Sequence, residues 1–270
     1  MPSPTPSNGP NAGRMAELGD KLAGVVRVGA CQTPEILADP DTALGCIEQF
    51  AAQGADRGAD LLLFPECFLQ GYLTDDEHVS RYALELDSSG FAAVLRRLAP
   101  VEPTLVFGVS EADSGHFFNT AVVVDRGRLV GRYRKTRLMP GETVFTAGED
   151  YPTFVVRGLL RYGINICSDT QFPEPAARVA SQGATLLLVA AQNMMRRPTA
   201  TRFKDLHHSM RAERARETGM WLVSADVTGT REDRIAYGPT SVLSPRGDVM
   251  AQVPLQTTGI VVADIPVMPR

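Results

Sequence analysis

The sequence predicts one α/β domain in which strands and helices alternate into layered sheets. Short apolar runs rich in β-branched residues alternate with segments whose apolar residues recur at helical spacing. Neither a linker nor a break in composition interrupts residues 25–265. A chain of 270 residues with 44% hydrophobic and 21% charged side chains is long and apolar enough to bury a sizeable core.

In the N-terminal half, residues 25–31 alternate in polarity and predict a first strand. A helix is expected from Asp41, as its N-cap, to about residue 59, because apolar residues recur there at helical spacing. The run Leu-Leu-Leu-Phe-Pro at 61–65 is apolar and predicts a buried strand. Three further strands are expected at residues 104–109, 117–124 and 129–134.

The C-terminal half continues the alternation, with a helix expected from near Pro173. A second helix ends at Gly219 and carries one apolar face, formed by Phe203, Leu206, Met210 and Ala215. Strands are expected at residues 154–156, 162–166, 184–190 and 221–225, then a hairpin of 240–244 with 248–252 and a final strand at 259–265.

Charge and composition narrow the function classes. Lys and Arg number 27 and Asp and Glu 31, so the net charge is −4 and no nucleic-acid partner is expected. No apolar run approaches the roughly 20 residues that cross a bilayer. Residues 1–22 are predicted to be a disordered leader ahead of a domain at 23–270, because their start is rich in Pro, Ser, Asn and Gly and lacks a secretory signal. The four cysteines form no CxxC pair, which favours reduced thiols and a cytoplasmic location.

Three residues stand where strands end, which is where site residues of α/β sheets gather. Glu66 follows the apolar run at 61–65, and Lys135 follows the strand expected at 129–134. Cys167 lies on a strand-to-helix turn, where backbone N–H groups can hold an oxyanion. Taken alone, each residue also has a structural explanation: Glu66 as a solvated acid, Lys135 as part of a basic turn and Cys167 as a buried structural cysteine.

A catalytic cysteine needs a base, because a thiol with a pKa near 8.5 is only about 3% ionised at pH 7. The four histidines, His78, His116, His207 and His208, have no evident triad context, which leaves a Cys/His pair as the weaker alternative. A buried Glu66 with a pKa raised toward neutrality can serve as the base instead.

Together these segments resemble a known family. Phe64-Pro-Glu66, Tyr133-Arg-Lys135 and Ile166-Cys-Ser-Asp169 with Phe172-Pro-Glu174 look like the Glu, Lys and Cys motifs of the nitrilase superfamily of carbon-nitrogen hydrolases, in the expected order. Residues 65–72, 214–217 and 238–247 are similar to further segments of that family. The resemblance extends over residues 25–265.

The resemblance implies a fold and four catalytic roles. The fold would be a four-layer αββα sandwich that forms a homodimer or a higher homo-oligomer. Glu66 would be the general base, Lys135 the electrostatic stabiliser, Cys167 the nucleophile and Glu142 the second glutamate; neither a metal nor a cofactor is implied. The chain departs from the family pattern at Ser168, Thr218 and Asp226, which puts the substrate in doubt more than the chemistry.

The expected function is hydrolysis of a non-peptide carbon-nitrogen bond in a small amide or N-carbamoyl compound, through a cysteine thioester that releases ammonia or an amine. Motif position predicts Tyr72, Ser168, Phe172 and Asn193 as substrate-binding residues, and Arg196 as a ligand for a substrate carboxylate. Two alternatives stay open. One is an N-acyltransferase that forms the same thioester, and the other is a non-catalytic binding protein with this fold.

Overall fold

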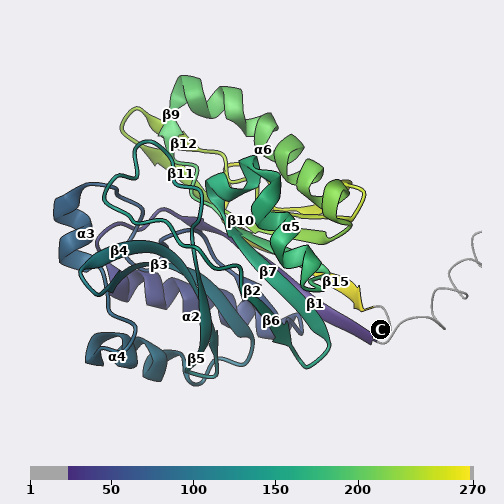
Figure 1. Ribbon diagram of the computed structural model, residues 1–270, viewed down its shortest axis with the longest axis horizontal. Coiled ribbons are helices and arrows are strands. Elements are labelled where there is room, and N and C mark those ends of the chain that lie inside the picture. Colours follow the sequence, from purple (N-terminus) through teal and green to yellow (C-terminus); the bar gives the residue numbers. More distant parts are fainter. Residues whose placement is uncertain (1–23, 268–270) are drawn as a thin grey trace, which may run out of the picture.

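The computed structural model describes residues 24–267, which form two β-sheets packed face to face with helices on both outer sides (Figure 1). The layers are helix, sheet, sheet and helix, so the predicted αββα sandwich is confirmed. The predicted leader at residues 1–22 lies outside the described residues. Within residues 24–267, no helix is both long and apolar enough to cross a membrane.

The first sheet has nine strands in the order β5-β4-β3-β2-β1-β11-β12-β9, with β15 also paired to β1. The long β1 organises this sheet, because it pairs in parallel with β2 and antiparallel with β15. The bounds are β1 (Gly24–Pro34), β2 (Leu61–Leu63), β3 (Thr104–Asp113), β4 (His116–Asp125), β5 (Arg128–Arg134), β9 (Met195–Arg196), β11 (Val227–Arg231), β12 (Arg234–Ala236) and β15 (Gly259–Val267).

The second sheet has six strands in the order β14-β13-β10-β8-β7-β6. Its central strands β7, β8 and β10 run parallel, so their C-terminal ends meet at one edge. The bounds are β6 (Thr153–Val156), β7 (Leu160–Ile166), β8 (Leu186–Ala190), β10 (Trp221–Ala225), β13 (Ser241–Leu243) and β14 (Val249–Gln252).

Three layers of apolar contacts hold the sandwich together. Leu63 and Ile164 belong to the core between the sheets. Ile47 and Phe91 pack helices against the nine-stranded sheet, and Val179 packs a helix against the six-stranded sheet. Each such buried side chain contributes about 1.5–3 kcal/mol. The helices are α2 (Pro40–Asp56), α3 (Asp76–Tyr82), α4 (Ser89–Leu98), α5 (Pro173–Ser181) and α6 (Arg197–Thr218), with the short 3₁₀ helix η1 (Cys167–Gln171).

Two helices differ in detail from the sequence prediction. The N-cap of α2 is Asp39 rather than Asp41, because Asp39 accepts a hydrogen bond from Thr42 N and Pro40 occupies the first turn. That helix ends at Asp56, three residues early. In α6 the predicted face is only partly confirmed: Ala215 is buried and Phe203 and Met210 are half-buried, but Leu206 is exposed, and Arg211, which was not predicted, is buried. Helices α3 and α4 and strands β9, β11 and β12 were not predicted from the sequence.

Gly108 in β3 allows the chain after β2 to turn closely over the sheet. Gly108 N donates to Pro65 O at 3.1 Å, and Leu69 N donates to Gly108 O at 3.0 Å. A Cβ at this position would lie 2.1 Å from the backbone nitrogen of Cys67 and 2.6 Å from the carbonyl carbon of Glu66. Glycine is therefore required there by close backbone approach.

Asp169 in η1 ties the turn after β7 to the segment after β5, and so joins the two sheets. Its Oδ2 accepts hydrogen bonds from Ile166 N and Tyr133 Oη, both at 2.8 Å. Its Oδ1 accepts from Arg137 N at 2.8 Å and from Thr136 N and Oγ1 at 3.2 and 3.0 Å. Five donors on one buried carboxylate fix the two segments relative to each other.

Replacing Gly108 with alanine is expected to lower the free energy of unfolding by about 1–3 kcal/mol, because the new methyl group has to displace backbone rather than a side chain. Urea denaturation measures the change. Gly45→Ala in α2 is the matched control, since its methyl group meets only the end of the Arg97 side chain, at 3.7 Å. Equal stability of the two variants would contradict the packing argument.

Asp169→Asn is expected to cost about 3 kcal/mol of unfolding free energy, because an amide NH₂ then faces donors that formerly shared a carboxylate oxygen. Chemical denaturation again provides the measurement. Asp248→Asn, at an exposed ion pair with Arg246, should change stability by less than about 1 kcal/mol. A loss at Asp169 as small as that at Asp248 would rule out the proposed link between the sheets.

Candidate active site

Glu66 lies directly after the central strand β2, where the chain turns over Gly108. Its backbone N–H donates to Ala191 O at 3.3 Å, so the turn is also attached to the end of β8 in the other sheet. The side chain is buried. One of its oxygens, Oε1, accepts two hydrogen bonds, whereas Oε2 accepts none from residues 24–267.

Lys135 follows β5 and joins Glu66 to the predicted second glutamate. Its Nζ donates to Oε1 of Glu66 and to Oε1 of Glu142, both at 2.7 Å. Asn119 in β4 donates from Nδ2 to the same two oxygens, at 2.8 and 3.2 Å. All four residues are at most 1% exposed. The structure thus brings together three residues that the sequence prediction named and one that it did not.

The charges of this cluster determine its proton affinities. Burial raises the pKa of Glu66 to about 7; the negative charge of Glu142 also raises this pKa, and Lys135 lowers it. Burial alone would lower the pKa of Lys135, but the carboxylates of Glu66 and Glu142 and the nearby Cys167 raise it above its usual value. Lys135 is therefore a fixed positive charge, and Glu66 titrates near neutral pH.

Cys167 is the first residue of η1, immediately after β7. Its backbone has φ of 43°, in the left-handed region where a non-glycine residue is strained. Hydrogen bonds on both sides stabilise this strained conformation. Asp169 accepts one from Ile166 N, and Thr170 Oγ1 donates one to Cys167 O at 2.8 Å. Such a turn presents the side chain away from the strand. Cys167 is partly exposed, unlike the cluster of Glu66, Lys135 and Glu142.

The thiol shares its electrostatic environment with the cluster. Desolvation by burial raises the pKa of Cys167. The carboxylates of Glu66, Asp226 and Glu142 raise this pKa further, and Lys135 lowers it. The thiol therefore stays protonated at neutral pH and needs a base to become a nucleophile. The charged groups that act most strongly on this thiol are carboxylates and the ammonium of Lys135.

The predicted substrate-binding residues fall into two groups. Tyr72 is attached to the cluster, because its hydroxyl donates to Oε1 of Glu142 at 3.0 Å. Ser168 follows the cysteine, and its buried hydroxyl donates its proton to Arg137 O at 2.5 Å, so this donor is already occupied. Asn193 is buried after β8 and bonds to Asp226.

Phe172 and Arg196 lie further out. Phe172 is 45% exposed beside the guanidinium of Arg137. The side chain of Arg196 is 73% exposed and pairs with Asp233 at 3.6 Å, so the structure does not bring it into the cluster. The exposed position of Arg196 agrees with its place on β9, which ends the order of described strands and pairs with β12.

Asn119 was missed by the sequence analysis, although one signal pointed to it. It is a polar residue within the apolar segment Phe117 to Val124, and a buried polar side chain in a strand requires partners. Those partners, Glu66 and Glu142, are distant in sequence, so the strand pattern alone could not name them.

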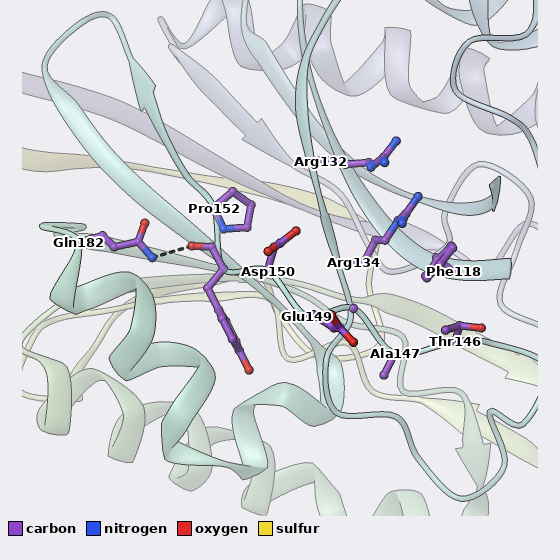
Figure 2. A pocket seen from close by; sticks show the side chains of 11 residues that line it. Phe118, Arg132, Arg134, Thr146, Ala147, Glu149, Asp150, Pro152 and Gln182 are labelled. Carbon is purple, nitrogen blue, oxygen red and sulfur yellow. Dashed lines mark hydrogen bonds between the residues drawn. The ribbon is translucent and has the colours of Figure 1, made fainter. Parts of the chain in front are cut away.

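A hollow of about 720 Å³ lies on the other side of β5 and is separate from this cluster (Figure 2). Side chains alternate along a strand, so Arg132 and Arg134 face the hollow while Tyr133 and Lys135 face the interior. Gln182 Nε2 donates to Tyr151 O across its rim at 2.8 Å. Both arginines pair with Glu111 and with Asp113, so their two positive charges face two carboxylates.

The arrangement combines a thiol, a carboxylate of raised pKa and a fixed ammonium. An ammonium has three donors, and Glu66 and Glu142 take two of those on Lys135, which leaves one for a developing oxyanion. In the part of the chain that the structure describes, no group of three or more His, Cys, Asp or Glu side chains is placed to hold a metal ion.

Comparison with known proteins identifies the family. The profile of the Carbon-nitrogen hydrolase family matches residues 27–268. An (R)-stereoselective amidase from Pseudomonas sp. is 28% identical, over 78% of this chain and 76% of its own. The chloroplastic omega-amidase of Arabidopsis thaliana is 30% identical, over 88% and 67%.

A solved structure has the same fold. It is a glutamate-to-glutamine mutant of the amidase from Nesterenkonia sp. AN1, with the acetamide moiety of fluoroacetamide added covalently at its active-site cysteine. It superposes with a TM-score of 0.76 at 25% identity, over 89% of this chain and 90% of that one. The chain described here belongs to the carbon-nitrogen hydrolases of the nitrilase superfamily and is an enzyme of that class.

Proposed function

We propose that this enzyme hydrolyses a small amide through a thioester on Cys167. The observation that carries the proposal is the buried contact of Lys135 with Glu66 and Glu142, both at 2.7 Å, beside a cysteine on a strained turn. The amidases among its relatives support an amide as the substrate.

Acylation begins when Glu66 takes the proton of the Cys167 thiol through its unbonded Oε2, and the sulfur attacks the substrate carbonyl carbon. The carbonyl oxygen gains the negative charge, which the third N–H of Lys135 and the backbone N–H of Ser168 stabilise. Each such donor is typically worth about 100-fold to 1000-fold in rate. Glu66 then gives its proton to the departing nitrogen, the carbon-nitrogen bond breaks, and a thioester remains.

Hydrolysis reverses the roles of the same groups. Glu66 removes a proton from water, the resulting hydroxide attacks the thioester, and the carbon-sulfur bond breaks to release the acid. The sulfur recovers the proton from Glu66. Glu142 keeps Lys135 in place throughout, because it is bonded to Nζ and is itself held by Met139 N at 2.6 Å.

The proposal does not depend on a charged group in the substrate. A carboxylate-binding role for Arg196 has no support from its position, because this arginine already pairs with Asp233 at the surface. A hydrolysis screen for released ammonia over amides, N-carbamoyl compounds and nitriles tests the substrate class. Pairs of amides with and without a carboxylate, assayed on the wild type and Arg196→Ala, test the role of Arg196.

Cys167→Ala is expected to abolish ammonia release, and Glu66→Gln to lower kcat/KM by about 100-fold to 10,000-fold. Gln keeps an oxygen for Lys135 and Asn119 but replaces the free Oε2 with an NH₂ that cannot accept a proton. Mass spectrometry of quenched reactions should detect the acyl group on Cys167 in the wild type only. Cys46→Ser, on α2, is the matched thiol control and should retain activity. Full turnover by Cys167→Ala would end the proposal.

The pKa of Glu66 near 7 predicts the acidic limb of the pH profile. The base must be ionised, so kcat/KM should rise with pH and level off above about pH 7. Glu142→Gln removes a negative charge that raises the pKa of Glu66, so the midpoint of this limb should move to lower pH, whatever the loss in maximal rate. An unchanged midpoint, or one moved to higher pH, would count against Glu66 as the base.

A further inference from the structure

A second buried ion pair lies next to the active site and has no part in the mechanism above. Arg211 of α6 and Asp226, between β10 and β11, approach to 3.5 Å between Nη2 and Oδ2. Their side chains are 2% and 0% exposed. Burying two charges is costly, and replacing such a pair with apolar residues often stabilises a protein. Stability alone therefore does not account for this pair.

Asp226 determines how the side chain of Asn193 is oriented. Its Oδ1 accepts hydrogen bonds from Asn193 N at 3.0 Å and Val227 N at 2.9 Å, and its Oδ2 accepts one from Asn193 Nδ2. An ionised carboxylate only accepts, so Asn193 has to turn its NH₂ toward Asp226 and its carbonyl oxygen away. The charge on Asp226 thereby selects one of two amide orientations.

The segment that carries Asn193 runs between the base and the nucleophile. It follows β8, whose last residue Ala190 pairs with Ile166, the residue before Cys167. Two residues before Asn193, the carbonyl of Ala191 accepts a hydrogen bond from Glu66 N. A change at Asp226 therefore reaches a segment that contacts both catalytic turns.

The positive charge of Arg211 opposes the effect of the negative charge of Asp226 on the thiol of Cys167. Its Nη1 donates to Pro239 O at 2.6 Å and to Ser224 Oγ at 3.0 Å, which fixes the guanidinium. Ala225 pairs with Ala190 and Ala190 with Ile166, so Asp226 and Cys167 follow strand ends at the same edge of the sheet, and Arg211 lies against Asp226 there. Burial lowers the pKa of Arg211, and Asp226 and Cys167 raise it. Asp226 in turn raises the pKa of Cys167.

We propose that Arg211 and Asp226 are positioning residues of this active site: Asp226 holds Asn193 with its carbonyl oxygen available to a substrate N–H, and Arg211 cancels the charge of Asp226 next to Cys167. The first part rests on the proposed amide hydrolysis, whereas the second concerns the thiol and needs no turnover.

Alkylation of Cys167 by iodoacetamide tests the charge balance without a substrate. Below the pKa of a thiol, the alkylation rate rises about tenfold per pH unit, so a change in pKa displaces the whole line of log rate against pH. The groups that act on Cys167 in this range are Glu66, Lys135, Glu142, Asp226, Arg211 and the Tyr72 hydroxyl.

Replacing Asp226 and replacing Arg211 are expected to displace the line of log alkylation rate against pH in opposite directions. Asp226→Asn should move the line to lower pH by about one unit, and Arg211→Met should move it to higher pH by a similar amount. The double variant, with neither charge, should lie close to the wild type. A merely structural pair would displace both single variants in the same direction, and that result, or no displacement, would overturn the charge role.

Misfolding of a single variant would be detected by circular dichroism. Arg211→Lys and the double variant keep the test valid in that case. Arg211→Lys keeps the positive charge and should leave the line near the wild type. The double variant Arg211→Met/Asp226→Asn buries no unpaired charge, so it should fold even where Arg211→Met does not. If the line of the double variant is displaced as far as that of Asp226→Asn alone, Arg211 contributes nothing to the charge balance at Cys167.

Arg246→Met and Asp248→Asn, at an exposed ion pair of 3.2 Å, are the matched controls and should not displace the line.

A double-mutant cycle tests the orientation of Asn193, using the best amide from the screen. Asp226→Asn can offer an NH₂ to Asn193 and so permits the reversed amide, and Asn193→Ala removes the amide. Each should lower kcat/KM by about tenfold or more, and the double variant should lose no more than the worse single variant. Losses that multiply would overturn the link between Asp226 and Asn193. If the wild type hydrolyses no amide, the proposed function fails, while the alkylation result still decides the charge role.

Discussion

The active site depends on one buried ammonium held between two carboxylates. Burial alone disfavours the charge of Lys135, and only its bonds of 2.7 Å to Glu66 and Glu142 make it stable there. The same contact fixes Oε1 of Glu66, and burial with Glu142 brings the pKa of Glu66 into the neutral range. One interaction thus sets the position of the cation and the proton affinity of Glu66, which are the two properties that the proposed cysteine mechanism requires.

The two sheets are needed because this cluster draws on both. Glu66, Asn119 and Lys135 come from the nine-stranded sheet, and Cys167 follows a strand of the six-stranded sheet. Hydrogen bonds at the ends of the strands fix the two sheets relative to each other. Asp169 accepts hydrogen bonds from Arg137 N, after β5, and from Ile166 N, at the end of β7, and Glu66 N donates to Ala191 O. Packing between the sheets provides stability, but these few bonds decide where the sulfur lies relative to the base.

The sequence was enough to predict the layered fold, most of its strands and the motifs around Glu66, Lys135 and Cys167, because strand ends and local turns leave local patterns. It could not predict contacts between distant segments. Asn119 has its partners 53 and 23 residues away, and the charge of Asp226 is compensated by Arg211 on another element. The apolar face expected on α6 was wrong at Leu206 and did not include Arg211, because the buried arginine gains a partner that helical spacing does not reveal. Arg196 looked available in sequence and is paired with Asp233.

The two oxygens of Glu66 are unequal, since Oε1 is occupied by Lys135 and Asn119 while Oε2 accepts no hydrogen bond from the described residues. Every proton in the proposed cycle must then pass through a single atom. The proton from sulfur has to depart with the amine before one from water can arrive, so the two half-reactions cannot overlap in time. A nucleophile other than water that competes for the thioester would have to enter at the same stage, after the first product has gone.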